Sequence, residues 1–243
     1  MALKEYAIPE ARPLPVILML DVSGSMEEGD KINNLNEAVS EMIKTMADEE
    51  KMEVEILISV ITFGSDAHVH LTSTSASQVE WSNLSASGMT AMGAALTMSK
   101  EMIEDKEITP SRAYRPTIVL VSDGQPNDTG WEQSMDDFIN NGRSKKCDRM
   151  AMAIGKDADE NVLKRFIEGT EHELFYANNA DQLHEFFKYV TMSVTTRSQS
   201  QNPNEIPADS DLKSKVSDES NLTTENSDES AQSNGDTSDD GEW

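Results

Sequence analysis

The chain has 243 residues, of which 37% are hydrophobic, and its 45 acidic and 20 basic side chains give a formal net charge of −25. This length allows one large domain, or one domain with an accessory segment. So many carboxylates repel phosphate backbones and anionic membranes, so we expect no nucleic-acid or membrane binding, whereas cationic partners or metal ions suit the charge.

Short apolar runs alternate with helical patterns through residues 1–197. Continuous apolar or β-branched runs indicate buried strands, and apolar residues at steps of three and four indicate helices that bury one side. In chain order, the predicted elements are a strand at Pro15–Leu20, a helix through Ile32–Met46, strands at Val54–Phe63 and His68–Thr74, a helix through Met92–Ile103, a strand at Thr117–Val121, a helix at Trp131–Asn141, a strand at Arg149–Ile154, a helix at Glu160–Glu168, a strand at Leu174–Tyr176 and a helix at Asp181–Thr195.

This alternation predicts an α/β fold, a doubly wound and mostly parallel sheet with helices on both faces. The run His68–Thr74 follows the preceding strand after the short link "GSDA", which is too short for a crossover. It is therefore predicted to be an antiparallel edge strand. Sheets of this class bind ligands at the carboxyl ends of their strands.

The composition changes near residue 198. Residues 201–243 contain 12 acidic and 2 basic side chains, with few apolar residues. Such a segment cannot bury enough surface to offset the entropy lost on ordering. We therefore predict a folded domain at 1–197 and a disordered acidic tail at 198–243, which either serves solubility or docks on a basic partner.

Polar side chains gather where the predicted strands end. Asp21, Ser23 and Ser25 follow the first strand in "DVSGSM", and Asp123 follows a later strand in "SDGQPND". Thr90, in "SGMT", stands near the expected N-cap of a helix. The sheet is expected to bring these two carboxylates and three hydroxyls to one rim. The alternative is a simple turn whose side-chain oxygens cap backbone amides.

A set of oxygen donors suits a hard cation. Mg²⁺ prefers six oxygen ligands, and the absence of Cys and His from the set argues against zinc or iron. Mn²⁺ and Ca²⁺ remain alternatives. Two carboxylates neutralise a divalent ion, so the metal can accept one more carboxylate from a protein partner. Because no base or nucleophile is positioned there, no catalytic residue is predicted and a non-enzymatic protein–protein interaction module is expected.

The five residues also carry a family resemblance. "DVSGSM", Thr90 in "SGMTAMG" and Asp123 in "VSDGQPND" resemble the metal-ion-dependent adhesion site (MIDAS) of von Willebrand factor A (VWA) domains. The resemblance covers roughly residues 12–197 and implies a Rossmann-like fold. It also implies that the serines and Thr90 coordinate the ion directly, while one or both aspartates act partly through water.

Three segments resemble the bacterial tellurium-resistance-associated VWA subgroup most. They are "RPLPVILMLDVSGSM", "SVITFGSDAHV" and "YRPTIVLVSDGQPND". By family analogy, such proteins are cytoplasmic and act in stress-response systems, some of them with a protein kinase or phosphatase of the same system. That analogy concerns the fold, and function has to be argued from the site.

Two other functions are alternatives. A Mg²⁺-dependent phosphotransfer enzyme resembling haloacid-dehalogenase phosphatases also places an Asp after its first strand, but it needs a second Asp where this chain has Ser23. A structural VWA domain with an inactive metal site is the other alternative.

The remaining features favour a cytoplasmic protein. Cys147 is the single cysteine, so no intramolecular disulfide can form, which suits a reducing compartment. Met1–Pro15 lacks an apolar signal-peptide core, and the longest apolar run, Val16–Leu20, is too short to cross a membrane.

Overall fold

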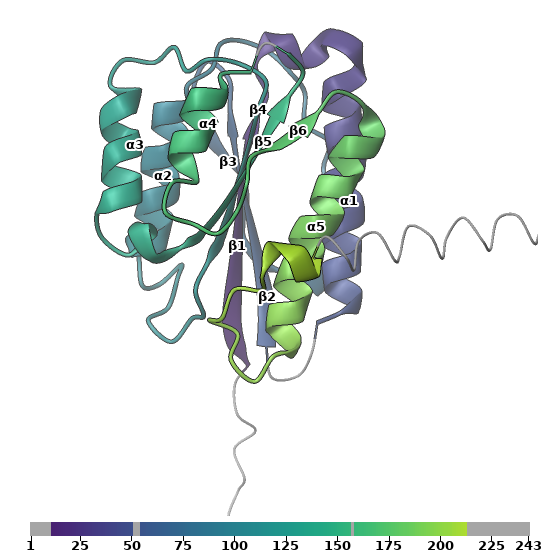
Figure 1. The fold of residues 1–243 in the computed structure, drawn as a ribbon, viewed down its shortest axis with the longest axis vertical. Helices are drawn as coiled ribbons and strands as arrows, with labels where there is room; N and C mark the ends of the chain where they lie inside the picture. The colour runs from purple at the N-terminus through teal and green to yellow at the C-terminus, as the bar shows by residue number, and fades with distance from the viewer. Residues whose placement is uncertain (1–10, 51–53, 157, 213–243) are drawn as a thin grey trace, which may run out of the picture.

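The computed structural model describes residues 11–50, 54–156 and 158–212. Its centre is a six-stranded sheet of order β3-β2-β1-β4-β5-β6, in which β3 is antiparallel to β2 and the other pairs are parallel (Figure 1). This confirms the predicted doubly wound α/β class with one antiparallel edge strand. The strands are β1 (Arg12–Asp21), β2 (Val54–Phe63), β3 (Ala67–Ser75), β4 (Thr117–Ser122), β5 (Asp148–Ile154) and β6 (Phe175–Ala177).

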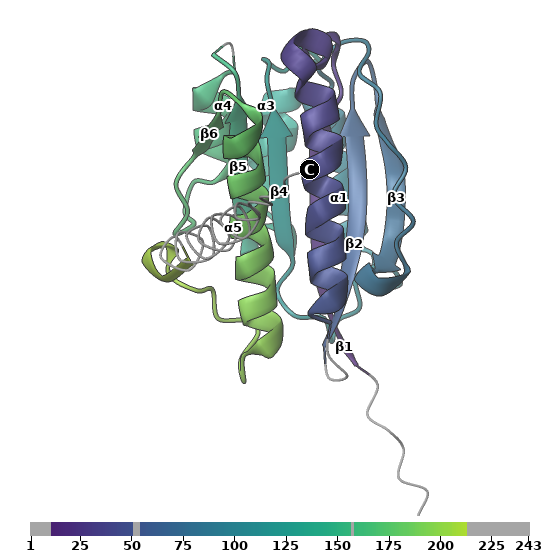
Figure 2. The same cartoon turned by 90° about the vertical axis from the view of Figure 1, so that its right-hand side faces the viewer.

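Helices cover both faces of the sheet. Helices α1 (Lys31–Asp48) and α5 (Ala180–Gln199) lie side by side on one face (Figure 2). The other face carries α2 (Met92–Glu104), α3 (Trp131–Asn140) and α4 (Glu160–Phe166). These five helices lie where the periodicity predicts them.

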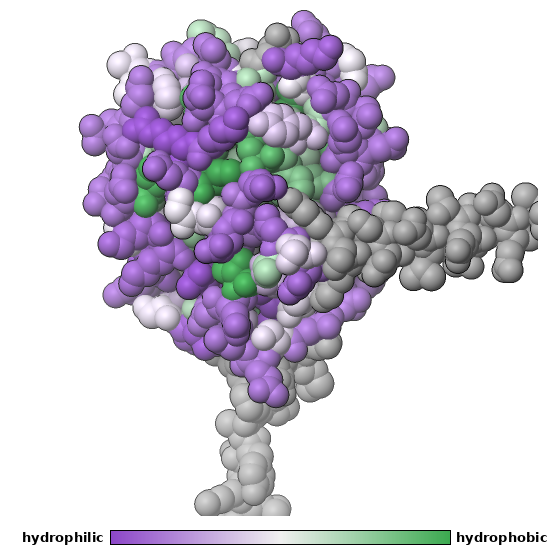
Figure 3. Space-filling view, in the orientation of Figure 1, coloured by the Kyte–Doolittle hydropathy of each residue, from purple (hydrophilic) through white to green (hydrophobic). Residues whose placement is uncertain are grey.

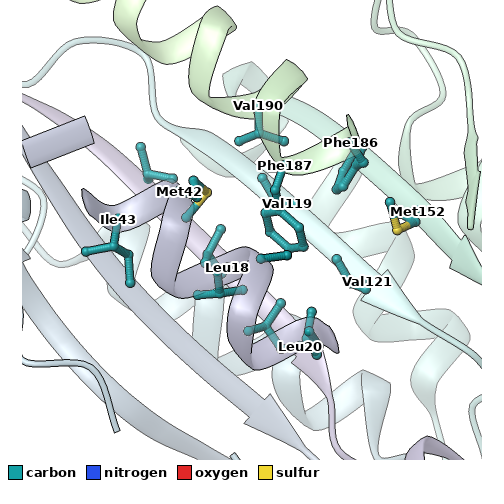
Figure 4. Close-up of a cluster of buried hydrophobic side chains, with 14 of the residues drawn as sticks. Leu18, Leu20, Met42, Ile43, Val119, Val121, Met152, Phe186, Phe187 and Val190 are labelled. Atoms are coloured by element: carbon teal, nitrogen blue, oxygen red, sulfur yellow. The ribbon is translucent and has the colours of Figure 1, made fainter. Parts of the chain in front are cut away.

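Strand β1 explains why the first apolar run is continuous. Leu18 and Leu20 pack with α1 and α5 on one face, in a cluster with Phe186 and Phe187 (Figure 4), whereas Met19 packs toward α2 on the other. Because successive side chains of a strand point to opposite faces, a central strand covered on both sides must be apolar at every position.

A 3-10 turn joins β1 to α1 and was not predicted. It spans Gly24–Asp30, and Gly29 and Asp30 both adopt left-handed backbone angles, with φ of 61° and 60°. Two further 3-10 turns are Ala76–Gln78 and Ser144–Lys146. Short turns of this kind lack the periodicity by which longer helices are detected.

The folded body extends past the predicted boundary at residue 197. After α5, the segment Ser200–Leu212, here called the strap, folds back against the domain, and Leu212 is fully buried in the hydrophobic core cluster on the α5 side of the sheet. Asp209 of the strap lies 2.8 Å from His172 Nδ1, while His172 Nε2 lies 2.8 Å from Asp148 Oδ1. The predicted boundary is therefore too early. The rest of the predicted tail, residues 213–243, lies outside the described residues.

Arg197, near the end of α5, fastens the strap to the sheet. Its buried guanidinium donates to Pro203 O (2.9 Å) on the strap and to Thr117 Oγ1 (2.6 Å) and Arg115 O (2.5 Å) at the start of β4. A planar guanidinium with several donors suits such a junction of three chain segments.

The face seen in Figure 3 is mostly hydrophilic, with apolar side chains showing through mainly between α4 and α5. Among the described residues, no helix is long and apolar enough to cross a membrane.

Candidate functional site

The structure brings four of the five predicted site residues together at the carboxyl ends of β1 and β4, the upper edge of the sheet in Figure 1. Ser25 Oγ donates to Asp123 Oδ1 at 2.7 Å, and the Ser23 and Ser25 hydroxyls lie 3.0 Å apart. Ser23 Oγ also lies 3.5 Å from Asp123 Oδ1. Asp21, beside them, is fully buried. The neighbouring strand ends thus create one cluster of oxygen atoms.

Asp21 holds the first loop in place. Its Oδ1 accepts the backbone N–H of Ser23 at 2.8 Å, and its Oδ2 accepts the hydroxyl of Ser122 from the adjacent strand at 2.6 Å. Burial raises the pKa of the Asp21 carboxyl, although the hydrogen bonds from Ser122 and Ser23 oppose the rise, and the charge of Asp123 adds a smaller increase. A nearby cation would stabilise the ionised form of such a buried carboxylate.

Thr90 reaches the site through the loop that carries Asp123. Its backbone N–H donates to Asn127 Oδ1 at 3.1 Å, and its carbonyl accepts the Asn127 N–H at 3.1 Å. The Thr90 hydroxyl faces Gly124, where an added Cβ would lie 3.4 Å from Oγ1. Thr90 therefore adjoins the residue after Asp123, although no hydrogen bond ties its hydroxyl to the other four residues in the described part of the chain.

The N-cap of α2 differs from expectation. The residue at the cap is Ala91 and not Thr90, and no side chain of the cap bonds the helix. Instead, the carboxylate of Asp128 accepts the N–H groups of Gly93 (3.2 Å) and Ala94 (2.9 Å). Because this carboxylate satisfies the free amides at the helix start, it fixes α2 to the Asp123 loop.

The loops pack closely enough to require glycine at Gly88. Its φ is 84°, and a Cβ there would lie 2.2 Å from Ser65 Oγ and 2.8 Å from Ser65 N. Its carbonyl accepts the Gly24 N–H at 3.0 Å, which joins the Thr90 loop to the loop of Ser23 and Ser25. Backbone bonds between loops thus set the spacing of the predicted ligands.

One cation from the chain itself enters the cluster. Lys31 Nζ, at the start of α1, lies 2.7 Å from Asp123 Oδ2 and 3.3 Å from Ser25 O. The Asp123 side chain is fully buried and that of Lys31 is 21% exposed. This pair leaves Asp123 Oδ1 facing the serines.

Sequence reasoning missed four residues that shape this cluster: Ser122, Lys31, Asn127 and Asp128. Ser122 and the "ND" pair stand next to predicted ligands in "VSDGQPND", so their position was a usable signal. The sequence contains no comparable signal for Lys31, because its contact with Asp123 joins positions that are 92 residues apart.

The donor chemistry fits a hard divalent ion. Carboxylate and hydroxyl oxygens converge on one point, and both carboxylates are buried and close enough to influence each other. Among the described residues, no three His, Cys, Asp or Glu side chains form a group that could hold a metal. The cluster therefore differs from sites built on nitrogen, sulfur or several carboxylates.

Comparisons with known proteins agree with this architecture. Comparison with curated proteins gives no match. VWA2, an ArnB paralog from Sulfolobus acidocaldarius, superposes with a TM-score of 0.57 at 20% identity, over 76% of this chain and 46% of that one. A von Willebrand factor type A protein from Catenulispora acidiphila gives 0.59 at 19% identity, over 75% and 43%. This chain thus spans less than half the length of either.

A third similar structure is proximal thread matrix protein 1 from the mussel byssus, with a zinc-occupied MIDAS motif. It has a TM-score of 0.57 at 16% identity, over 76% of this chain and 46% of that one. At such low identities, these structures establish the fold alone. The sequence itself matches the von Willebrand factor type A domain over residues 16–189, which is most of the described body. The chain therefore belongs to the von Willebrand factor type A domain family.

Proposed function

We propose that this VWA domain is a divalent-metal-dependent protein-interaction module with no catalytic activity of its own. The observation that carries the proposal is the convergence of Asp123 Oδ1 with the hydroxyls of Ser23 and Ser25, beside the buried carboxylate of Asp21. VWA domains are general protein-interaction modules, and in this one the oxygen donors come from two separate loops at the same edge of the sheet.

Asp21, Ser23, Ser25, Thr90 and Asp123 would hold the cation. Their oxygen chemistry favours Mg²⁺, with Mn²⁺ and Ca²⁺ as alternatives, and the zinc in the mussel protein makes Zn²⁺ a further ion to test. When bound, such an ion supplies an electrophilic point for a carboxylate of another protein. Asp21 accepts a hydrogen bond from the backbone N–H of Ser23 and so orients that residue. Asp21 would therefore contribute negative charge to the metal and also hold a second ligand in position.

The negative charge of the chain should make the binding of an acidic partner depend more strongly on the metal. With a net charge of −25, the chain as a whole repels an acidic partner. Attraction would then come from the metal, and complex formation should follow metal occupancy closely. Met89, 58% exposed and adjacent to Thr90, gives a partner an apolar contact beside the ion.

A phosphotransfer enzyme is a weaker explanation of the same carboxylates. Both oxygens of Asp21 accept hydrogen bonds and the residue is fully buried, which leaves no free nucleophile. The resemblance to tellurium-resistance-associated VWA proteins further suggests a cytoplasmic stress-response role with a kinase or phosphatase partner. A domain with an inactive metal site stays the simplest competing hypothesis.

Calorimetric titration of Mg²⁺ and Mn²⁺ into the full chain tests the site. Asp123→Asn should weaken binding at least about tenfold, because a ligand charge is lost and each tenfold change costs about 1.4 kcal/mol. Asp66→Asn is the matched control, since it removes an exposed carboxylate from a turn at the same edge of the sheet. Equal affinity in wild type and Asp123→Asn would contradict the proposal.

Partner capture then tests the interaction. Immobilised wild-type chain should retain a protein in Mg²⁺ and release it in EDTA, whereas Asp21→Asn and Asp123→Asn should capture none. Capture that persists in EDTA, with the fold intact by circular dichroism, would show that the metal is not the contact point.

A further inference from the structure

A basic cavity lies at the edge of the sheet opposite the candidate metal site. Its volume is about 560 Å³, and it is bounded by the residues that lead into β4, β5 and β6 and by the strap. Five basic side chains line it: Arg115, Arg143, Lys145, Lys146 and Arg149. They are a quarter of the 20 basic residues in the chain, gathered in one place on a strongly acidic protein.

Two of these charges, on the buried Arg149 and the half-buried Arg143, have no side-chain carboxylate partner among the described residues. The Arg149 guanidinium donates to the carbonyls of Phe166 (2.8 Å) and Glu168 (2.6 Å). The Arg143 guanidinium donates to the carbonyls of Ile103 (2.5 Å) and Thr109 (2.8 Å). Carbonyl oxygens satisfy the hydrogen bonds, but they carry no net charge to cancel the positive one.

The other three basic residues are exposed. Arg115, Lys145 and Lys146 make no side-chain ion pair or hydrogen bond within the described ranges. Of the two carboxylates that line the cavity, Asp148 is engaged by His172 and Arg197, which leaves Glu171 at the rim. The cavity is thus a local region of positive potential that an anionic group would neutralise.

The chain carries a complementary segment of its own. Residues 213–243 contain nine acidic and two basic side chains, a net charge of −7, and the remaining 212 residues carry 36 acidic and 18 basic ones. The motif "SDES" occurs twice in the segment, at 217–220 and 227–230. The acidic body repels such a segment almost everywhere, so the basic cavity is where its charge is best placed.

The segment also starts close to the cavity. Asn204 and Ile206 of the strap form part of the cavity wall, and the strap ends six residues further on at the buried Leu212. A flexible polypeptide 31 residues long, the length of this segment, has an end-to-end distance of about 30 Å, which is enough to reach the cavity. Tethering of this kind gives effective concentrations on the order of millimolar, so weak charge pairs can produce substantial occupancy.

We propose that the acidic C-terminal segment, residues 213–243, docks within its own molecule on the basic cavity formed by Arg115, Arg143, Lys145, Lys146 and Arg149. The contact is electrostatic and salt-sensitive. It occupies the site at which an acidic segment of another protein would otherwise bind, at the end of the domain remote from Asp21 and Asp123.

Paramagnetic relaxation in the full chain tests this docking. A nitroxide is attached at Thr224→Cys, between the two "SDES" motifs, while Cys147 stays unlabelled because it is buried. The amide signals of Lys145, Lys146 and Glu171 should lose at least about half their intensity. They should recover in about 1 M NaCl, where the Debye length falls to about 3 Å. Amides of α1 around Lys44 should be unaffected.

The charge variant Arg115→Ser/Lys146→Ser should remove the broadening, and the matched variant Lys44→Ser/Lys106→Ser, which deletes two exposed lysines elsewhere, should keep it. Broadening that survives Arg115→Ser/Lys146→Ser, or that is absent from wild type, overturns the proposal. So does broadening seen when labelled chains are mixed with separate isotope-enriched chains, because docking would then be intermolecular. Cavity signals that move with inorganic phosphate but not with the segment would instead identify a small-anion site.

Discussion

Replacing Lys31 by Met should tighten divalent-metal binding while weakening the metal-free fold. Lys31 Nζ lies 2.7 Å from Asp123 Oδ2, and the carboxylate is fully buried. A hydrogen bond to a charged group contributes about 1.5–3 kcal/mol to stability. Met keeps the apolar stem and removes the charge, so the free energy of unfolding in EDTA should fall by about 2 kcal/mol.

The free energy of the Lys31–Asp123 interaction should also affect metal binding. A cation that binds at the site must displace the Lys31 ammonium or bind against its electrostatic repulsion. Removal of that charge should therefore strengthen Mg²⁺ binding, by about 30-fold if the full 2 kcal/mol is recovered. Urea unfolding in EDTA and calorimetric titration measure the two quantities separately. Lys44→Met, on an exposed part of α1, should change neither. Unchanged or weaker Mg²⁺ binding in Lys31→Met would refute the reasoning.

Three further outcomes are expected. Burial alone would lower the pKa of His172, but the hydrogen bonds and charges of Asp148 and Asp209 outweigh it and raise the pKa. The stabilisation is therefore complete below the unfolded pKa of about 6.5 and is lost as the pH rises through the folded pKa, so urea midpoints should fall with pH less steeply in His172→Gln than in wild type. Leu212→Ala should lower the free energy of unfolding by about 2–5 kcal/mol, because Leu212 is fully buried in the core. A change near zero would show that the strap does not contribute to the core. Burial raises the pKa of the Cys147 thiol to about 12, so maleimide labelling at pH 8 should be slow until urea unfolds the chain; rapid labelling of the native protein would contradict this.

Most of the fold could be predicted from the sequence because its elements have local signatures. Strand β2 has the same bounds, Val54–Phe63, in prediction and structure, since a β-branched run buried on both faces is distinctive. The meeting of Asp21 with Asp123 also followed from a local rule, because the carboxyl ends of parallel strands share one edge.

What could not be predicted depends on contacts between distant segments. Lys31 is an ordinary surface residue by its helical position, and only the path of the preceding turn carries its amine to Asp123. Composition places the strap in the acidic tail because it is averaged over many residues, and a single apolar residue such as Leu212 does not change that average. In the structure, Leu212 is buried in the core, and Asp209 and Pro203 add contacts with His172 and Arg197 that hold the strap against the domain.

The bond between Ser122 and Asp21 has a consequence for the order of assembly. These residues are 101 positions apart, and they meet only when β4 has paired with β1. During synthesis, a nascent chain that has emerged only as far as β3 holds the first loop but neither Ser122 nor Asp123. Closing so long a loop is slow relative to forming local helices. Metal affinity should therefore arise late in folding, and uptake of an ion would report that the central strands have paired.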